Sequence, residues 1–219
     1  MNDRLVAAMA HFKDFDDEDD LPSSKENFKC TLDDFAFVAT HPDDPKTLDE
    51  ALRGPDTKHW ENALQYEINQ LEKLGTWEVE DLPAGQTPIP CSEVIRVKQG
   101  PDGKVQSYRV QIVAGGHRQV EGVNDTETFS ATAKMPTVHT VLANAAHQDW
   151  EIEHVDVKST YLNAELKETI YVKAPRGVLK PGQEGKVLRL KKGLYGLKQA
   201  GRGWYMEMSR VFVKELGFM

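Results

Sequence analysis

The sequence is poor in cysteine and has no long hydrophobic run. Its 219 residues include two cysteines, Cys30 and Cys91, which stand in no metal-ligand spacing. A disulfide is therefore not indicated, and we expect reduced thiols in an intracellular protein, either cytoplasmic or nuclear. No apolar segment approaches the roughly 20 residues that span a bilayer. The N-terminus also lacks the order of a signal peptide, so no membrane partner is expected.

The signatures of several enzyme classes are also missing. The chain has no Gly-x-Ser-x-Gly nucleophile motif and no dinucleotide fingerprint, and Gly115-Gly116 lacks the Gly-Lys-Ser/Thr ending of a phosphate loop. Its histidines never stand two to four residues apart, so they do not indicate a zinc site. There are seven of them: His11, His41, His59, His117, His139, His147 and His154.

Basic residues are fewer than acidic ones, and the formal net charge is −8. Residues 1–55 hold 14 acidic and 6 basic side chains, whereas residues 56–219 hold 21 of each sign. From Arg176 to Arg210 there are nine lysines and arginines against two acids, a local balance of +7. The acidic excess thus belongs to the N-terminal part. The basic segment is either a solvated face or a surface that attracts phosphate.

The patterning indicates a disordered leader and then a mixed fold. Residues 14–20 contain six acids, and proline and serine interrupt the residues after them, so residues 1–47 are expected to be mostly disordered. A short helix is expected over residues 48–53. An amphipathic helix from about residue 56 to Gly75 should bury Trp60, Leu64, Ile68 and Leu71.

Short strands and one further pair of helices complete the expected α+β fold. Residues 76–80 should form a strand, and residues 93–98 and 104–114 a hairpin around a Pro-Asp-Gly turn. Residues 138–147 are expected to form a helix that buries Val138, Val141, Leu142 and Ala145. Strands are expected over residues 169–173 and 186–191, and a last helix carries the apolar stripe Trp204, Met208, Phe212 and Leu216.

The segment Glu153-His154-Val155-Asp156-Val157 is the first candidate site. Its alternation predicts a strand in which the valines point to one face and His154 and Asp156 to the other. Tyr161 follows five residues after Asp156. A carboxylate beside a bulky ring is what a nucleotide-polymerising site needs to hold a metal and line a sugar pocket. A solvated aspartate is the other interpretation of this short motif.

Several further blocks point to one family. The first is Trp60, Glu67 and Leu71 followed by Gly75-Thr76-Trp77-Glu78, and the second is residues 119–130. The later blocks are Asp156-Val157-Lys158 with Leu162-Asn163, Ile170-Tyr171 with Pro175-Arg176-Gly177, and Leu194-Tyr195-Gly196-Leu197-Lys198-Gln199-Ala200 followed by Trp204-Tyr205. Over about residues 45–219, this ordered set resembles the reverse transcriptase of copia-type retrotransposons. The resemblance implies a right-hand polymerase, with the fingers at about residues 48–147 and an incomplete palm at about residues 148–219.

The same resemblance implies the roles of individual residues. Asp156 matches the family's first metal-binding and catalytic aspartate, and the carbonyl of Val157 would be a backbone ligand of the metal. Tyr161 matches the aromatic residue that crowds the sugar 2′ position and so favours deoxynucleotides. Lys198 and Gln199 lie in the block that lines the incoming nucleotide and the template. The implied cofactor is Mg²⁺ or Mn²⁺, and the implied partners are deoxynucleotides and an RNA or DNA template–primer.

The chain also departs from the family pattern. Of the cations expected in the fingers hairpin, Arg109 is present, whereas Gln111 and Gly115 replace two others. His139 stands where arginine is usual, and Gly201 where proline is usual. The block with two further metal-binding aspartates lies downstream in the family, as do the rest of the palm, the thumb and the RNase H region. One carboxylate does not neutralise two divalent ions, so we do not expect this chain to hold the metals stably.

Two functions therefore stay open at the level of sequence. The chain is either part of a reverse transcriptase, inactive until the remaining palm is supplied, or a non-catalytic remnant that acts at most as a weak nucleic-acid or protein-binding module.

Overall fold

The computed structural model of the chain describes residues 45–218, with the exception of residues 121, 125 and 154. Helices and strands are mixed along the chain, as the sequence predicted, and the strands form a three-stranded sheet and a separate hairpin. Disorder was predicted for residues 1–47, and residues 1–44 of that segment lie outside the described residues.

Two helices open the described part. The short helix α2 (Leu48–Ala51) begins at Thr47, whose hydroxyl oxygen accepts a hydrogen bond from the backbone N–H of Glu50 at 3.2 Å. Helix α3 (Thr57–Lys73) ends at Gly75, which takes a positive φ of 65°. Its buried residues are Trp60, Leu64, Ile68 and Leu71, so the predicted apolar stripe is confirmed.

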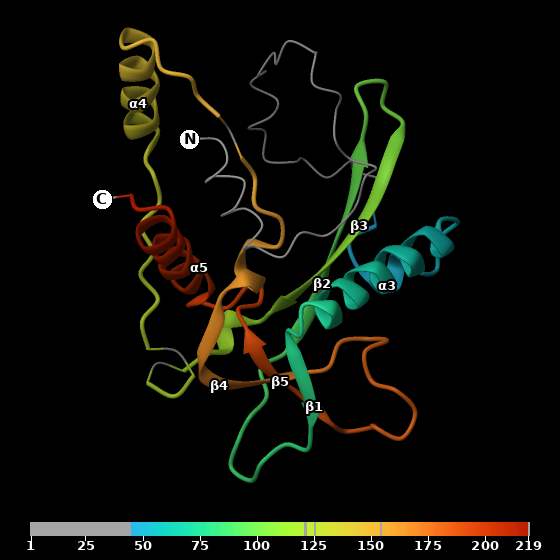
Figure 1. Cartoon of the computed structure of the whole chain (residues 1–219). Coiled ribbons are helices and arrows are strands. Elements are labelled where there is room, and N and C mark those ends of the chain that lie inside the picture. The colour runs from blue at the N-terminus through green and yellow to red at the C-terminus, as the bar shows by residue number, and fades with distance from the viewer. Residues whose placement is uncertain (1–44, 121, 125, 154, 219) are drawn as a thin grey trace.

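Helix α3 covers one face of the hairpin, as Figure 1 shows. The hairpin consists of β2 (Cys91–Gln99) and β3 (Val105–Ala114), paired antiparallel as predicted. Its helix-facing residues Val110, Ile112 and Ala114 are buried in the same core as α3. Cys91, at the start of β2, is half-buried, and its burial raises the pKa of the thiol to about 12.

The second sheet has the order β1–β5–β4, with both pairs antiparallel. Its strands are β1 (Trp77–Glu80), β4 (Glu165–Lys173) and β5 (Val187–Lys192). Strand β4 is longer than predicted, and its register with β5 shifts between Glu165 and Ile170. The buried residues Ile170, Val172, Leu188 and Leu190 join this sheet to the core under α3.

The alternation in β5 buries leucines on one side, as predicted, but its basic side is paired with acids. Arg189 forms ion pairs with Glu78 and Glu80, and Lys191 pairs with Glu78 at 2.5 Å. Six of the nine cations between Arg176 and Arg210 have such acidic partners: Arg176, Lys186, Arg189, Lys191, Arg202 and Arg210. The formal charge of +7 on the segment from Arg176 to Arg210 is therefore largely balanced by acidic side chains that pair with it.

Helix α4 (Met135–His147) forms where a helix was predicted, but its predicted buried face is wrong. Ala145 is buried, whereas Val138, Val141 and Leu142 are exposed by 36%, 58% and 45%. In Figure 1 this helix stands away from both sheets. The period of the apolar residues predicted the conformation, but no sheet in the described residues covers the apolar stripe.

The predicted strand around Asp156 is also wrong. The described residues from Glu151 to Val157 have no regular secondary structure, and Val155 is 45% exposed. A strand needs a neighbour to accept and donate its backbone hydrogen bonds, and no strand of the described part pairs with this segment. The predicted position of His154 on the open face lies outside the described residues.

The chain then turns into β4 and finally into a helix. A 3₁₀ turn, η3 (Thr160–Asn163), precedes β4. Helix α5 (Ala200–Arg210) continues as a π-helical turn, η4 (Val211–Glu215). Leu216 of the predicted stripe is buried, and Trp204, Met208 and Phe212 are half-buried. Among the described helices, none combines the length and the apolar character needed to cross a bilayer.

Candidate active site

The structure brings Asp156 and Tyr161 together through a third residue, Tyr195. The rings of Tyr161 and Tyr195 meet edge to face, with centroids 5.2 Å apart and an interplanar angle of 66°. Burial raises the pKa of Tyr195, and the negative charges of Glu67 and Asp156 raise it further. The carboxylate of Asp156 therefore lies within electrostatic reach of the Tyr195 phenol, whose ring in turn contacts Tyr161.

A sharp turn places Tyr161 after Asp156. Ser159 takes the left-handed conformation with φ of 51°, which is uncommon for a residue other than glycine. The turn is closed by the backbone N–H of Leu162, which donates to the Ser159 carbonyl at 2.8 Å. Leu162 is buried in the core, so it anchors the turn while the Tyr161 ring stays half-buried. Strained backbone of this kind clusters at functional sites.

The carbonyl of Val157 keeps capacity for a further ligand. It accepts a hydrogen bond from the Thr160 hydroxyl at 2.7 Å. A carbonyl oxygen has two lone pairs, so one remains. The exposed Asp156 carboxylate and this carbonyl are oxygen donors of the type that Mg²⁺ prefers, and they fit one part of a magnesium site. Within the described residues, no group of three or more His, Cys, Asp and Glu side chains is arranged to hold a metal ion.

The loop Gly193–Gly196 holds Tyr195 in place. The backbone N–H of Gly193 donates to the Ala164 carbonyl at 2.9 Å, and the Tyr195 carbonyl accepts from the Ala114 N–H at 2.7 Å. A Cβ atom on Gly193 would lie 2.7 Å from the Tyr161 carbonyl oxygen. The backbone of this loop therefore packs directly against the backbone at η3 on one side and at the end of β3 on the other.

Lys198 and Gln199 are engaged within the protein. Gln199 is 5% exposed, and its side-chain carbonyl accepts from the amide of Gln119 at 2.8 Å. Both side-chain amides donate to the backbone carbonyl of Asn124, at 2.8 Å from Gln119 and 3.0 Å from Gln199. Lys198 donates to Gln119 through its backbone N–H, at 2.9 Å, and through Nζ, at 3.2 Å. This network fixes the block to residues 119–124, and only a rearrangement would turn the Gln199 amide toward a nucleotide.

Arg109 lies on the face of the hairpin opposite α3, apart from the two tyrosines. It is exposed, and its cross-strand partner in the register is another exposed cation, Arg96. Lys98, two residues further along β2, is exposed too. Like charges directly opposite each other destabilise a hairpin, and an anion bound between them would relieve that repulsion. Arg96 and Lys98 were not predicted from the sequence, although the hairpin register and the period of two could have placed them beside Arg109.

Glu67 of α3 is one of the residues that carry the family resemblance, but no role in the site was predicted for it from the sequence. Its carboxylate accepts a hydrogen bond from the Ile112 backbone N–H at 3.2 Å. Burial raises the pKa of Glu67, and the hydrogen bond from Ile112 opposes that effect. Glu67 thus links α3 to β3 through this hydrogen bond, and its negative charge contributes to the raised pKa of Tyr195.

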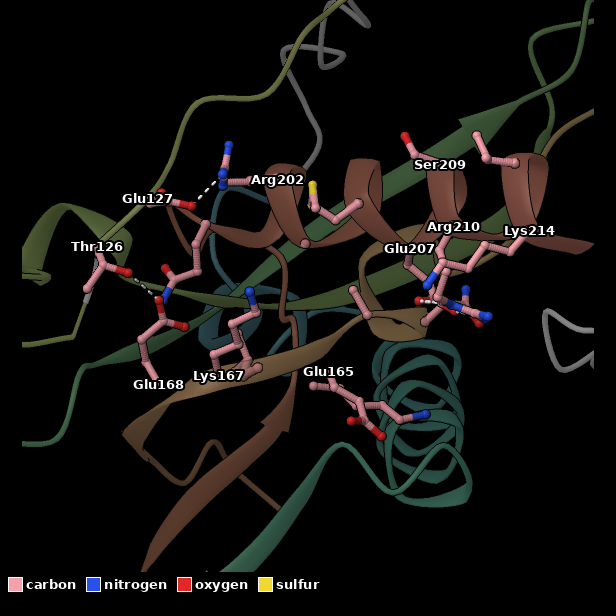
Figure 2. Close-up of a pocket in the computed structure, with 18 residues that line it drawn as sticks. Thr126, Glu127, Glu165, Lys167, Glu168, Arg202, Glu207, Ser209, Arg210 and Lys214 are labelled. Carbon is pink, nitrogen blue, oxygen red and sulfur yellow. Dashed lines mark hydrogen bonds and ion pairs between the residues drawn. The ribbon is translucent and has the colours of Figure 1, made fainter. Parts of the chain in front are cut away.

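A large groove lies next to these residues, between α5 and the first half of β4. Its cavity volume is about 1030 Å³, and its walls combine charged and apolar side chains, as Figure 2 shows. Arg202 points toward Glu127, and Thr126 donates to Glu168 at 2.8 Å across one end. Gln199 and Asn163 line the groove, but the residues lining it in the described part do not include Asp156 or Tyr161. The groove is therefore separate from the candidate site at Asp156 and Tyr161, although Asn163 of η3 lines it.

Comparisons with known proteins agree on one family. A family model described as reverse transcriptase (RNA-dependent DNA polymerase) matches residues 74–219. The chain is 38% identical over 164 residues to a retrovirus-related Pol polyprotein from transposon TNT 1-94 of Nicotiana tabacum. It is 33% identical over 177 residues to the corresponding polyprotein from transposon RE1 of Arabidopsis thaliana.

These alignments cover much of this chain but little of the relatives. They span 75% and 80% of the chain, and 12% of each plant polyprotein. A truncated transposon Ty1-A Gag-Pol polyprotein of Saccharomyces cerevisiae is 33% identical over 159 residues, which are 71% of the chain and 13% of that protein. No solved structure matches the chain significantly.

Proposed function

The chain belongs to the reverse transcriptase family of copia-type retrotransposons, and from this premise we propose that it forms part of an RNA-directed DNA polymerase. In this proposal residues 48–147 correspond to the fingers and residues 148–219 to the first part of the palm. The complete enzyme would add deoxynucleotides to the 3′ end of a primer, directed by an RNA or DNA template.

The observation that carries this proposal is the contact of Tyr161 with Tyr195, whose phenol lies within electrostatic reach of Asp156. Asp156 would supply one carboxylate ligand, and Val157 a carbonyl, to a divalent cation, Mg²⁺ or Mn²⁺. When bound, a pair of such ions stabilises the attacking and leaving oxygens of the transfer. The ring of Tyr161 would stand where a ribose 2′-hydroxyl needs room, and would thus exclude ribonucleotides sterically.

The basic face of the hairpin, formed by Arg96, Lys98 and Arg109, is proposed to bind phosphate. A nucleic-acid backbone or a triphosphate would relieve the repulsion between Arg96 and Arg109, which face each other across the two strands. Lys198 and Gln199 are proposed to border the nucleotide site. In the arrangement seen here they act as supports, because Gln199 is buried and bonded to Gln119.

We expect the 219 residues to be inactive in DNA synthesis by themselves. Asp156 is one carboxylate, and two divalent cations held close together need several anionic ligands. Primer extension should therefore be undetectable with this chain alone. It should appear when the chain is joined to the segment immediately after the aligned part in the tobacco relative, and Asp156→Asn should abolish it in the joined protein. Extension by the chain alone would contradict the proposed division of the site.

Binding of a primer–template duplex tests the basic face separately. The affinity should fall steeply with salt, and the variant Arg96→Gln/Arg109→Gln should reduce the slope of log K against log salt by about 0.9 per lost phosphate contact. Lys173→Gln is a matched control, because Lys173 is an exposed cation on β4 of the other sheet. An equal effect of the control would mean that the hairpin has no special role.

A non-catalytic binding module is the second candidate. It is favoured by Gln111 and Gly115, which replace two cations of the family's fingers. This candidate predicts salt-dependent duplex binding by the chain, together with no extension by the joined protein. Activity of the joined protein that depends on Asp156 would rule it out.

A further inference from the structure

Tyr195 contacts the candidate sugar-pocket residue but has no assigned role. Its ring meets the edge of the Tyr161 ring at a centroid distance of 5.2 Å. Both side chains are half-buried, so the pair borders the surface and is not sealed in the core. The charges of Glu67 and Asp156 also act on the Tyr195 phenol.

The backbone on both sides of Tyr195 is fixed by close contacts. The Tyr195 carbonyl accepts from Ala114 at 2.7 Å, and Gly193 donates to Ala164 at 2.9 Å. Gly196 has a φ of 87°, and a Cβ atom there would lie 2.6 Å from Cγ1 of Val113 and closer still to the Ala114 carbonyl. Both ends of this four-residue loop are therefore fixed by backbone contacts.

Tyr161 is held less firmly by its own turn. It belongs to a 3₁₀ turn of four residues that begins at Ser159 with a positive φ. The anchor of that turn is Leu162, which is 2% exposed. The half-buried Tyr161 ring packs against the main core, and the Tyr195 ring meets it edge to face. Tyr195 is thus one of the contacts that set the direction of the Tyr161 ring.

We propose that Tyr195 is a specificity-determining positioning residue, which holds the Tyr161 ring against the 2′ position of the incoming sugar. This inference rests on the proposed function, because it requires Tyr161 to line a nucleotide site. Tyr195 acts through its ring and does not touch the nucleotide. The same loop also contacts the end of β3, so the setting of the ring is linked to the position of the fingers hairpin.

The test uses the protein joined to the segment that follows the aligned part in the tobacco relative, bound with Mg²⁺ to a duplex whose primer lacks a 3′-hydroxyl. Equilibrium dialysis then measures the ratio of its affinities for dATP and ATP. Tyr195→Ala should lower the dATP-to-ATP affinity ratio by about three- to tenfold, the size expected for one lost aromatic pair. Tyr195→Phe should retain the ratio, because the ring remains. Tyr195→Leu, which keeps apolar volume for folding, should lower the ratio as Ala does.

A double-variant comparison separates positioning from a general loss of structure. In the Tyr161→Ala background, Tyr195→Ala should cause no further loss of preference, because both changes remove the same contact. Tyr205→Ala, at an exposed tyrosine of α5, is the matched control and should leave the ratio unchanged. Duplex binding should be equal in all variants.

The outcomes distinguish this inference from the proposed function. A ratio for Tyr195→Ala and Tyr195→Leu within twofold of the unaltered joined protein, while Tyr161→Ala abolishes the preference, would overturn the role of Tyr195 alone. An additive loss in the double variant would overturn it as well. If the joined protein extends primers but binds dATP and ATP equally well, the sugar pocket and the inference both fail. If it extends no primer, the proposed function fails and the inference fails with it.

Discussion

The α3–hairpin unit and the segment from α4 to Asp156 have equally regular apolar patterns but very different environments. In the first, Trp60, Leu71 and Ile112 are at most 2% exposed. In the second, Val141 and Val155 are 58% and 45% exposed. The first unit contains both members of a packed pair, a helix and the hairpin that it covers. The second presents an apolar helix face and a strand-like sequence with no described element against them.

This difference separates two kinds of information in a sequence. A hydrophobic period reports the conformation in which apolar residues share a face. Whether that face is buried depends on a second surface, which lies elsewhere in a chain or in another molecule. The prediction of a helix over residues 138–147 was correct because the hydrophobic period reports conformation. The prediction of its buried face was wrong because no second surface in the described residues covers it.

The largest expected effect is in the packed unit. Trp60→Ala should destabilise the chain by about 3–5 kcal/mol, because it removes a ring that is 2% exposed and that meets Tyr108 edge-on at 4.9 Å. Urea unfolding followed by circular dichroism measures this change. A loss below about 1 kcal/mol would mean that α3 and the hairpin are not the stable part of the chain.

A second variant tests whether the Tyr195 loop belongs to that stable unit. Gly196 and Gly182 both have a φ of 87°, but of the two only Gly196 has atoms within 4 Å of the position that a Cβ would occupy. Gly196→Ala should therefore cost about 1–3 kcal/mol more than Gly182→Ala, which shares the backbone strain but not the clash. Equal unfolding free energies for the two variants would show that the loop yields easily.

The pH dependence of stability gives a finer test of the α3–β3 contact. Burial raises the pKa of Glu67 above its ordinary value of 4.5, so the folded chain holds that proton more tightly than the unfolded chain does. The contribution to stability is full below pH 4.5 and is lost as the pH rises through the raised value.

Glu67→Gln should remove this fall in stability with rising pH, since glutamine does not titrate and its carbonyl can still accept from Ile112. Urea unfolding across the pH range from the ordinary glutamate pKa to neutrality would reveal it. Glu61→Gln, at an exposed acid on the same helix, should leave the fall in place. If Glu67→Gln keeps the same slope as the unaltered chain, Glu67 is not the group responsible.

The smallest expected effect is on α4. Val141→Ser should change the unfolding free energy by no more than about 0.5 kcal/mol, as for other exposed positions. A cost of several times that size would mean that something covers this helix in solution. Repeating the measurement at different protein concentrations would then show whether a second copy is responsible.

Elements made of neighbouring residues were predictable, and those that depend on distant contacts were less so. The stripe of α3 and the Pro-Asp-Gly turn of the hairpin follow from local periodicity and turn chemistry. The ion pairs of Arg189 and the contact of Tyr195 with Tyr161 join residues that are 34 or more positions apart in the chain, and no period reports them.

The candidate site divides in the same way. Asp156 and Tyr161 were found by resemblance to a family, and the structure adds Tyr195 because it shows the ring contact. The strand expected at Asp156 failed because strands are defined by their neighbours. Gln199 was expected at a nucleotide, yet its amide is used inside the protein, a fact that only its pairing with Gln119 discloses.

The half-buried thiol of Cys91 has a practical use. Because the thiolate is the form that reacts, a pKa of about 12 leaves the sulfur nearly inert toward alkylating reagents at neutral pH while β2 stays paired with Ala114 of β3. Any event that peels the base of the hairpin from the rest of the protein would restore ordinary reactivity. The rate of alkylation at Cys91 therefore measures how often the hairpin opens at its contact with the Tyr195 loop.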